Sequence, residues 1–259
     1  MAKKKYLISK KADGFFSGIY DVCEFLSQFL KEAFSPPFEF KELINQCYQV
    51  GCKSLPLISL TGFITGLVFT KQSRPSLSEF GATSWLPSLI SIAVVRALAP
   101  LVTALIAAGK VGSNIGAELG SMKVTEQIDA MEVSGTDPFK FLVVTRIAAT
   151  TLMLPVLVLY SGLMGMLGSY LNIYQNELTS FPAFINNAFK TISFLDIISS
   201  IFKATCYGFT IGVAGCYQGY YAKNGTKGVG MAANSAVVIS MFLIFVEEMV
   251  IVQFVNAIR

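Results

Sequence analysis

Residues Ala104 to Pro138 read ALIAAGKVGSNIGAELGSMKVTEQIDAMEVSGTDP, a stretch that passes from an apolar segment into a polar one. Small residues recur in it at every fourth position: Ala104, Ala108, Gly112, Gly116 and Gly120. On a helix they share one face, which a second helix can approach closely. In the polar segment, Thr125 is expected to cap a short helix and Gly135 to end it. Asp137 and Pro138 then match the start of another helix.

The short helix carries acidic residues three positions apart, at Glu126, Asp129 and Glu132. This spacing places them on one face, and Ile128 and Met131 give that face an apolar flank. A short helix with a mixed acidic and apolar face, between two apolar segments, is suited to contact with a soluble partner. The alternative is a solvated loop helix that has no partner.

The composition indicates an integral membrane protein. The chain has 259 residues, 53% hydrophobic and 14% charged, and its mean hydropathy is +0.60. Histidine is absent, which excludes histidine-based catalysis and most zinc chemistry. The five cysteines form no CxxC pair and are expected to be free thiols. We therefore predict no catalytic residues, no metal site and no nucleic-acid partner. Gly109 and Lys110 do not form a P-loop, so ATP hydrolysis is expected elsewhere.

Periodicity predicts an all-α fold with five transmembrane helices preceded by an amphipathic interfacial helix. Residues 1–50 form the N-terminal cytoplasmic and interfacial part, and residues 51–259 form a single transmembrane domain. The amphipathic helix covers residues 15–33, with Tyr20, Cys23 and Leu30 on its apolar side and Phe25 outside the pattern. This helix lies either on the membrane or on the protein's own core. The five spans are expected at about 54–70, 86–108, 141–171, 197–220 and 231–255.

The distribution of Lys and Arg predicts the topology. Thirteen of these residues fall on the side that holds the N-terminus and the loops after the second and fourth spans, and four fall on the other. The N-terminus and the loop 109–140 are therefore expected in the cytoplasm and Arg259 in the periplasm. The chain would be a multi-pass protein of the inner membrane, with its acidic helix on the ATP-containing side.

Four charged residues lie within the expected spans: Arg96, Lys203, Glu247 and Glu248. Arg146 lies near the start of the third span. A charge at a helix centre costs about 2.5–3.5 kcal/mol on insertion scales, so these residues are expected to pair or to face a wet cavity. A structural ion pair such as Lys203 with Glu248 is one interpretation. Contact with a lipid headgroup is the other.

From Gly109 to Val133 the chain resembles the signature of the MlaE family, the permease subunits of MCE-type lipid ABC transporters. The shared elements include A-E-L-G at 117–120 and V-T-E-Q-I-D-A at 124–130. The resemblance extends over about Phe38 to Val255. The family usually reads R-E-L-G-P after the second span begins, but this chain has Ala97 in place of Glu. The partner of Arg96 therefore stays open.

The resemblance implies a non-catalytic permease subunit that works as two copies, with an ABC ATPase and an MCE-domain substrate-binding protein. The resemblance is also compatible with a small STAS-type cytoplasmic subunit as a further partner. The cargo would be phospholipid or a related membrane lipid, and ATP and Mg would bind in the partner, with no cofactor on this chain. The residues expected to couple to the ATPase are Glu118, Lys123, Thr125, Glu126, Ile128, Asp129, Met131 and Glu132.

A dimer with an outward-opening apolar cavity would take its walls from the first and fifth spans. The candidates are Leu60, Phe63, Ile64, Leu67, Phe242, Phe245 and Met249. They would otherwise face bulk lipid or neighbouring helices. The residues expected at close helix contacts are Gly112, Gly116, Gly120, Gly208 and Gly212.

Two other transporter classes compete with this interpretation. A solute-importing ABC permease would have an E-A-A loop, and Asp129-Ala130-Met131 is only loosely similar to that motif. An ion-coupled secondary carrier could use the charges within the spans, but such carriers usually contain internal repeats, and none is visible.

Overall fold

The structure is a computed structural model, and it describes residues 18, 20–36, 38–177, 179–223 and 225–258. Within that part every regular element is a helix. Five helical segments are long and apolar enough to cross a membrane: Phe40–Glu79, Thr83–Val124, Phe139–Asn176, Phe194–Tyr220 and Gly225–Ala257. This confirms the expected all-α fold with five spans, and each expected span lies inside one of these segments.

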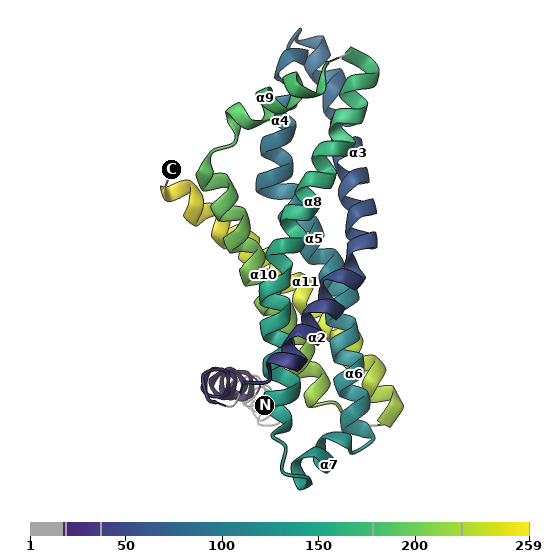
Figure 1. The fold of residues 1–259 in the computed structure, drawn as a ribbon, viewed down its shortest axis with the longest axis vertical. Helices are drawn as coiled ribbons and strands as arrows, with labels where there is room; N and C mark the ends of the chain where they lie inside the picture. The colour runs from purple at the N-terminus through teal and green to yellow at the C-terminus, as the bar shows by residue number, and fades with distance from the viewer. Residues whose placement is uncertain (1–17, 19, 37, 178, 224, 259) are drawn as a thin grey trace, which may run out of the picture.

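The helices form an elongated bundle (Figure 1). In chain order the α-helices are α2 (Phe40–Val50), α3 (Leu55–Glu79), α4 (Leu86–Ala93), α5 (Ala99–Ala107), α6 (Ser113–Val124), α7 (Gln127–Val133), α8 (Thr145–Glu177), α9 (Phe181–Thr191), α10 (Phe194–Tyr220) and α11 (Gly225–Ile258). Short 3-10 turns are η1 (Cys52–Ser54) and η2 (Thr83–Trp85). Three π-helical segments lie in the second and third spans: η3 (Val94–Leu98), η4 (Ala108–Gly112) and η5 (Phe139–Val144).

The second span is longer than its apolar core suggests. It was expected to end near Ala108, but the helical path continues through η4 and α6 to Val124. The whole segment has 42 residues and is therefore about 63 Å long at 1.5 Å per residue, about twice the thickness of a bilayer core. The row of small residues lies within this one continuous path, which carries α7 to the end of the bundle (Figure 1).

The connection between the third and fourth spans contains a helix that we did not predict. In α9, Phe184 and Ala188 are buried one turn apart, and the helix packs on α4. The hydroxyls of Ser88 and Ser91 on α4 each donate 3.1 Å hydrogen bonds to α9 carbonyl oxygens. The four-residue spacing of these two apolar residues is the sequence pattern that indicates a helix here. We overlooked it because α9 has only eleven residues and lies between two long apolar segments.

The amphipathic helix, described over residues 20–33, packs on the protein with a different face from the one expected. Phe25 is fully buried, although it falls outside the predicted apolar side, while Tyr20 and Leu30 are exposed. The rings of Phe25 and Tyr217 lie 5.5 Å apart, and those of Phe29 and Phe209 lie 5.8 Å apart. The helix therefore docks on α10 and still leaves apolar side chains uncovered (Figure 1). The predicted residues 15–17 and Arg259 lie outside the described residues.

Glycine allows the helix backbones to approach closely at several places. A Cβ at Gly112 would lie 3.4 Å from Ile211, and one at Gly116 would lie 3.2 Å from the backbone of α11. On α10, a Cβ at Gly208 or Gly212 would meet the backbone of α8. Gly120 in turn packs against Ala222 and α11. The small-residue stripes are thus packing seams, which is how helices associate when lipid removes the hydrophobic driving force.

A further seam joins α3 to α8. A Cβ at Gly62 would lie 2.9 Å from the carbonyl oxygen of Ser161, and one at Gly66 would overlap the carbonyl of Gly165. Gly168 on α8 in turn faces the backbone of Phe63. Both helices therefore contribute glycine to this contact, and a side chain at either position must separate them.

Replacing Gly66 with alanine is expected to destabilise the bundle, because backbone atoms of α8 occupy the space that the new Cβ needs. Overpacking of this kind costs about 1–3 kcal/mol. The measurement is the temperature at which the protein in detergent loses its monodisperse elution peak. Gly230→Ala is the matched control, because Gly230 is also helical and has no atom within 4 Å of its Cβ position. Equal melting temperatures for the two variants would contradict the close contact at this seam.

Candidate functional site

The short helix α7 lies at one end of the bundle, where the second span turns back toward the third (Figure 1). Our prediction that Thr125 caps this helix was wrong. Because α6 runs to Val124, Thr125 follows the end of α6, and its hydroxyl donates a 2.9 Å hydrogen bond to the Ser121 carbonyl. The residue before α7 is Glu126, which has a left-handed backbone with φ of 59°. This conformation makes the sharp turn between the two helices.

The other boundaries of α7 follow the sequence signals. Gly135 has φ of 80°, a value that glycine adopts without the steric cost of a side chain. The Asp137 carboxylate then accepts hydrogen bonds from the backbone N–H groups of Phe139 at 3.0 Å and Lys140 at 3.2 Å. Asp137 and Pro138 therefore begin the third span as expected.

The exposed face of α7 differs from the predicted one. Glu126, Asp129 and Glu132 are all exposed, as a docking face requires. Ile128, however, is only 1% exposed and belongs to the protein's own core, and Met131 packs against that core. The two residues therefore anchor α7 and cannot form the apolar flank of a docking face. The large apolar residue that α7 exposes is its last, Val133, at 91%.

Ion pairs connect the α6–α7 turn to the bundle. The ammonium group of Lys123 on α6 lies 2.7 Å from the carboxylate of Asp129 on α7. Further along α6, the Glu118 carboxylate lies 2.9 Å from the guanidinium of Arg146 on α8. The Arg146 side chain is buried, whereas that of Glu118 is 46% exposed. Movement of α6 relative to α8 would break this pair, so Glu118 links the turn to the third span.

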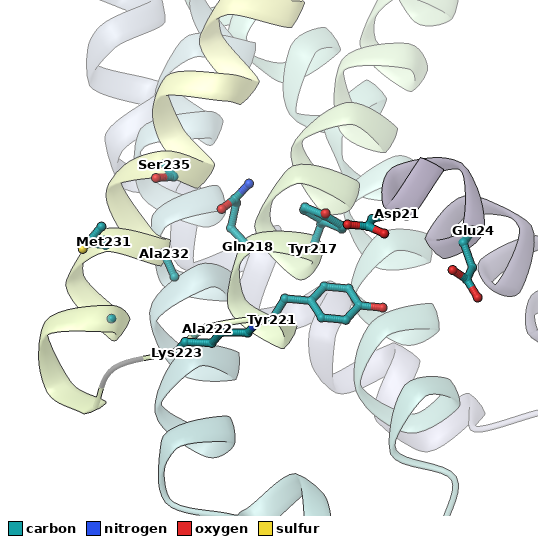
Figure 2. A pocket seen from close by; sticks show the side chains of 11 residues that line it. Asp21, Glu24, Tyr217, Gln218, Tyr221, Ala222, Lys223, Met231, Ala232 and Ser235 are labelled. Atoms are coloured by element: carbon teal, nitrogen blue, oxygen red, sulfur yellow. The ribbon is translucent and has the colours of Figure 1, made fainter. Parts of the chain in front are cut away.

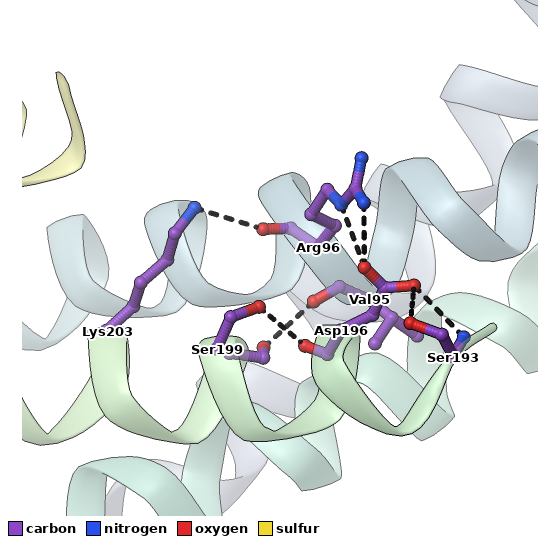
Figure 3. A network of polar contacts seen from close by, with 7 residues as sticks. Val95, Arg96, Ser193, Asp196, Ser199 and Lys203 are labelled. Carbon is purple, nitrogen blue, oxygen red and sulfur yellow. Dashed lines mark hydrogen bonds and ion pairs between the residues drawn. The ribbon is translucent and has the colours of Figure 1, made fainter. Parts of the chain in front are cut away.

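A polar network at the start of α10 provides the partner of Arg96 (Figure 3). The Arg96 Nε and Nη2 atoms donate hydrogen bonds of 3.0 and 2.8 Å to one oxygen of Asp196. The other Asp196 oxygen accepts from the backbone N–H and the hydroxyl of Ser193, both at 3.0 Å. Our sequence analysis missed this carboxylate, although Ser193 and Asp196 form the capping-box pattern that precedes an apolar run.

The network continues along α10 to α11. Lys203 Nζ lies 2.6 Å from the Glu248 carboxylate and 3.3 Å from the carbonyl oxygen of Arg96 (Figure 3). The second Glu248 oxygen accepts a hydrogen bond from the Tyr207 hydroxyl, and Glu247 accepts one from Thr210. The expected ion pair of Lys203 with Glu248 is thus present, and all four charges that we singled out within the spans have polar partners.

The lipid-facing candidates occupy two helices that one chain leaves largely uncovered. In the most apolar windows of the first and fifth spans 22% of residues are buried, against 56% in the third and fourth. Leu60 and Ile64 on α3 are exposed, and Phe63 and Leu67 are half-buried. Phe242, Phe245 and Met249 on α11 are all exposed. Within a single chain α3 packs mainly on α8, and α11 packs mainly on α10 and α6, so each helix leaves its candidate face largely uncovered.

Metal ligation finds no support in the part of the chain that the structure describes. No group of three or more His, Cys, Asp or Glu side chains there is placed to hold an ion. The chemistry of this site is therefore that of charge pairing and helix contact.

Comparisons with known proteins agree with this arrangement. Residues 43–254 match the family described as Permease MlaE. A probable ABC transporter permease protein of Rickettsia prowazekii is 37% identical over 91% of this chain and 90% of its own length. A probable ABC transporter permease protein of Synechocystis is 35% identical over 80% and 79%. The chloroplast protein trigalactosyldiacylglycerol 1 of Arabidopsis thaliana is 33% identical over 83% of this chain and 61% of its own length. Together with the five apolar helices, these matches show that this multi-pass membrane chain belongs to the MlaE family of ABC transporter permeases.

Proposed function

We propose that this permease subunit moves phospholipid or a related lipid across or out of the inner membrane. It acts as a homodimer and binds a separate ATPase subunit through α7. ATP and Mg belong to that ATPase, and the permease chain itself carries no cofactor and no catalytic group. An MCE-domain protein on the opposite side of the membrane receives or delivers the lipid, and a small STAS-type subunit is a further candidate partner on the cytoplasmic side.

The observation that carries the proposal is the form of α7. Its three carboxylates and Val133 are exposed, while Ile128 fixes the helix to the core. Force applied to α7 would therefore reach the spans directly, through the core below it and through the pair of Glu118 with Arg146. A solvated loop helix with no partner would not need this rigid attachment.

The lysine and arginine count supports the orientation. The end of the bundle that holds α7 also holds the described N-terminal residues and the connection between α10 and α11 (Figure 1). Together with the residues that precede them in the sequence, these segments carry thirteen of the Lys and Arg residues, against four elsewhere outside the spans. By the positive-inside rule this end faces the cytoplasm, where an ATPase is available, and the C-terminus faces the periplasm.

Two features support a lipid cargo and a dimer. The exposed faces of α3 and α11 consist of aliphatic, aromatic and methionine side chains, which suit flexible acyl tails. Because one chain leaves both faces largely uncovered, a second copy would enclose a cavity between them. One relative is also named for trigalactosyldiacylglycerol, a lipid with a diacylglycerol tail. We extend that lipid class to this chain as part of the proposal.

Replacing Glu126, Asp129 and Glu132 together with lysine is expected to release the ATPase and to leave the permease inserted and dimeric. All three side chains are exposed, so the change leaves the core intact, whereas a charge mismatch at an interface costs several kcal/mol. The measurement is ATP hydrolysis that co-purifies with the tagged permease. Val133→Asp should weaken the same association, because it places a charge at the one fully exposed apolar position of α7.

The matched control reverses Glu32 and Glu39, which lie outside α7, in the amphipathic helix and just before α2. These reversals should leave ATPase binding unchanged. Wild-type binding by the triple α7 variant would show that this helix is not the docking element.

Glu118→Ala is expected to retain ATPase binding and to lose lipid-stimulated ATP turnover, because it removes the link between α6 and α8. Removing one partner of a fully buried pair costs about 3–5 kcal/mol, and solvent around Glu118 lowers that cost here. Melting and ATP turnover are measured on the same preparations. Adding Arg146→Met removes the unpaired buried charge, so the double variant should regain stability without regaining turnover. If the double variant regained both stability and ATP turnover, the role of Glu118 would be purely structural.

Photo-crosslinking residues at Phe63 and Phe242 are expected to capture lipid in the assembled transporter. The yield should change when the ATPase is trapped with vanadate, because a transport cavity changes shape during the cycle. The control position is Leu163 on α8, which is exposed on a span outside the proposed cavity and should capture bulk lipid at a constant yield. Crosslinks from Phe63 and Phe242 to protein alone would contradict the cavity.

A further inference from the structure

A separate cavity lies between the amphipathic helix, the end of α10 and the start of α11 (Figure 2). Its volume is about 560 Å³. The side chains that line it include Asp21 and Glu24 from the amphipathic helix, Tyr217 and Tyr221 from the end of α10, and Lys223 and Met231. None of these residues is among those assigned above to α7 or to the lipid-facing candidates on α3 and α11, so the cavity is distinct from both groups.

One wall of the cavity is acidic. Asp21 and Glu24 are three residues apart and share a face of the amphipathic helix. Both are exposed, and within the described part of the chain neither has a hydrogen-bond or ion-pair partner. In Figure 2 the Asp21 carboxylate lies beside the Tyr217 ring, and the Tyr221 hydroxyl points toward the amphipathic helix. This wall therefore offers two negative charges that form no ion pair with a cation in the described part of the chain.

Aromatic rings stand next to these carboxylates. The rings of Tyr217 and Tyr221 are 5.2 Å apart, and Phe25 holds them in place at 5.5 and 6.2 Å. Burial, together with the negative charges of Glu24 and Asp21, raises the pKa of the Tyr221 phenol, so this ring stays neutral at physiological pH. Neutral aromatic rings beside carboxylates are a typical environment for an organic ammonium group.

The far side of the cavity is different. Lys223 supplies a positive charge there, and Met231, Ala232 and Ser235 come from the first turns of α11 (Figure 2). Met231 lies within the fifth candidate span, whereas Tyr221 and Lys223 lie just outside the fourth. The cavity therefore passes from the acidic wall to an exposed apolar side chain of a candidate membrane-spanning helix.

From this arrangement we infer that the cavity binds the headgroup of a zwitterionic phospholipid. The ammonium group lies between Asp21, Glu24 and the tyrosine rings, the phosphate faces Lys223, and the acyl chains leave along Met231. Such a lipid bridges the amphipathic helix to α10 and α11 on the α7 side of the membrane. An anionic lipid that lacks the ammonium group could still place its phosphate near Lys223, but it would leave the two carboxylates without a cation.

Native mass spectrometry of the purified protein tests this inference. The protein is mixed with phosphatidylethanolamine, phosphatidylcholine and phosphatidylglycerol of identical acyl chains. We expect the two zwitterionic lipids to bind about tenfold more strongly than phosphatidylglycerol, which is the effect of one desolvated cation–π or charge-assisted contact. Asp21→Asn with Glu24→Gln should remove this preference. Equal binding of the three lipids to the wild-type protein would overturn the inference.

Matched variants separate the binding site from general effects on folding. Glu32→Gln with Glu39→Gln changes the same number of carboxylates outside the cavity and should keep the preference. Tyr221→Phe keeps the ring and should bind like wild type, whereas Tyr221→Leu should lose most of the preference. A full preference in Tyr221→Leu would contradict the role of the ring, whatever the acidic variants do.

A competition experiment distinguishes a lipid from a soluble amine. Phosphoethanolamine has the same headgroup chemistry without acyl chains, so it should displace the lipid only at much higher concentration. Displacement at equal concentration would overturn the assignment to a lipid. The inference requires only that the chain spans a membrane. Because the assay contains no ATPase and measures no transport, its result is independent of the proposed function.

Discussion

Close contact between helix backbones is the constraint on which the rest of this structure depends. Where α10 packs on α6, a Cβ at Gly219 would lie 2.7 Å from Leu119, and one at Gly215 would lie 3.1 Å from Ile115. Lipid tails are as apolar as leucine, so spans associate through dispersion contacts and interhelical polar bonds rather than through hydrophobic burial. Small residues make those contacts possible over several turns. They also fix the position of α6 relative to α8 and α10, and hence that of α7.

The charges within the spans depend on this packing. Arg96, Asp196, Lys203 and Glu248 come from three different helices, and each would be costly in a lipid environment without its partner. The close approach of α10 to η3 and α11 brings them into hydrogen-bond range. In return, the pairs determine which helices can be neighbours, because a slip of one turn would leave buried charges unpaired. Packing and charge pairing therefore specify the same arrangement of the spans.

Helix α7 shows how one short element is both anchored in the core and exposed on an acidic face. Ile128 packs in the core and determines the orientation of α7, so that the three carboxylates and Val133 remain at the surface. Lys123 and Glu118 connect the same turn to α7 and α8 through ion pairs. A contact made at α7 is thus attached to the third span by both apolar and charged groups. The amphipathic helix has the same dual character, because Phe25 docks it while Asp21 and Glu24 face the separate cavity.

The sequence by itself determined the helical class, the five spans, the small-residue seams, the turn at Gly135 and the family. These depend on local composition and on spacing along one helix, which are visible without a fold. The tertiary structure decided which face of each amphipathic helix is buried, as Phe25 and Ile128 show. It also decided the partners of Arg96 and Arg146, because Asp196 and Glu118 are remote in sequence and are brought close only by packing. The continuation of the second span to Val124 could not be predicted from the sequence for a related reason. Its polar residues resemble a loop until the glycines among them are seen to pack against α10 and α11.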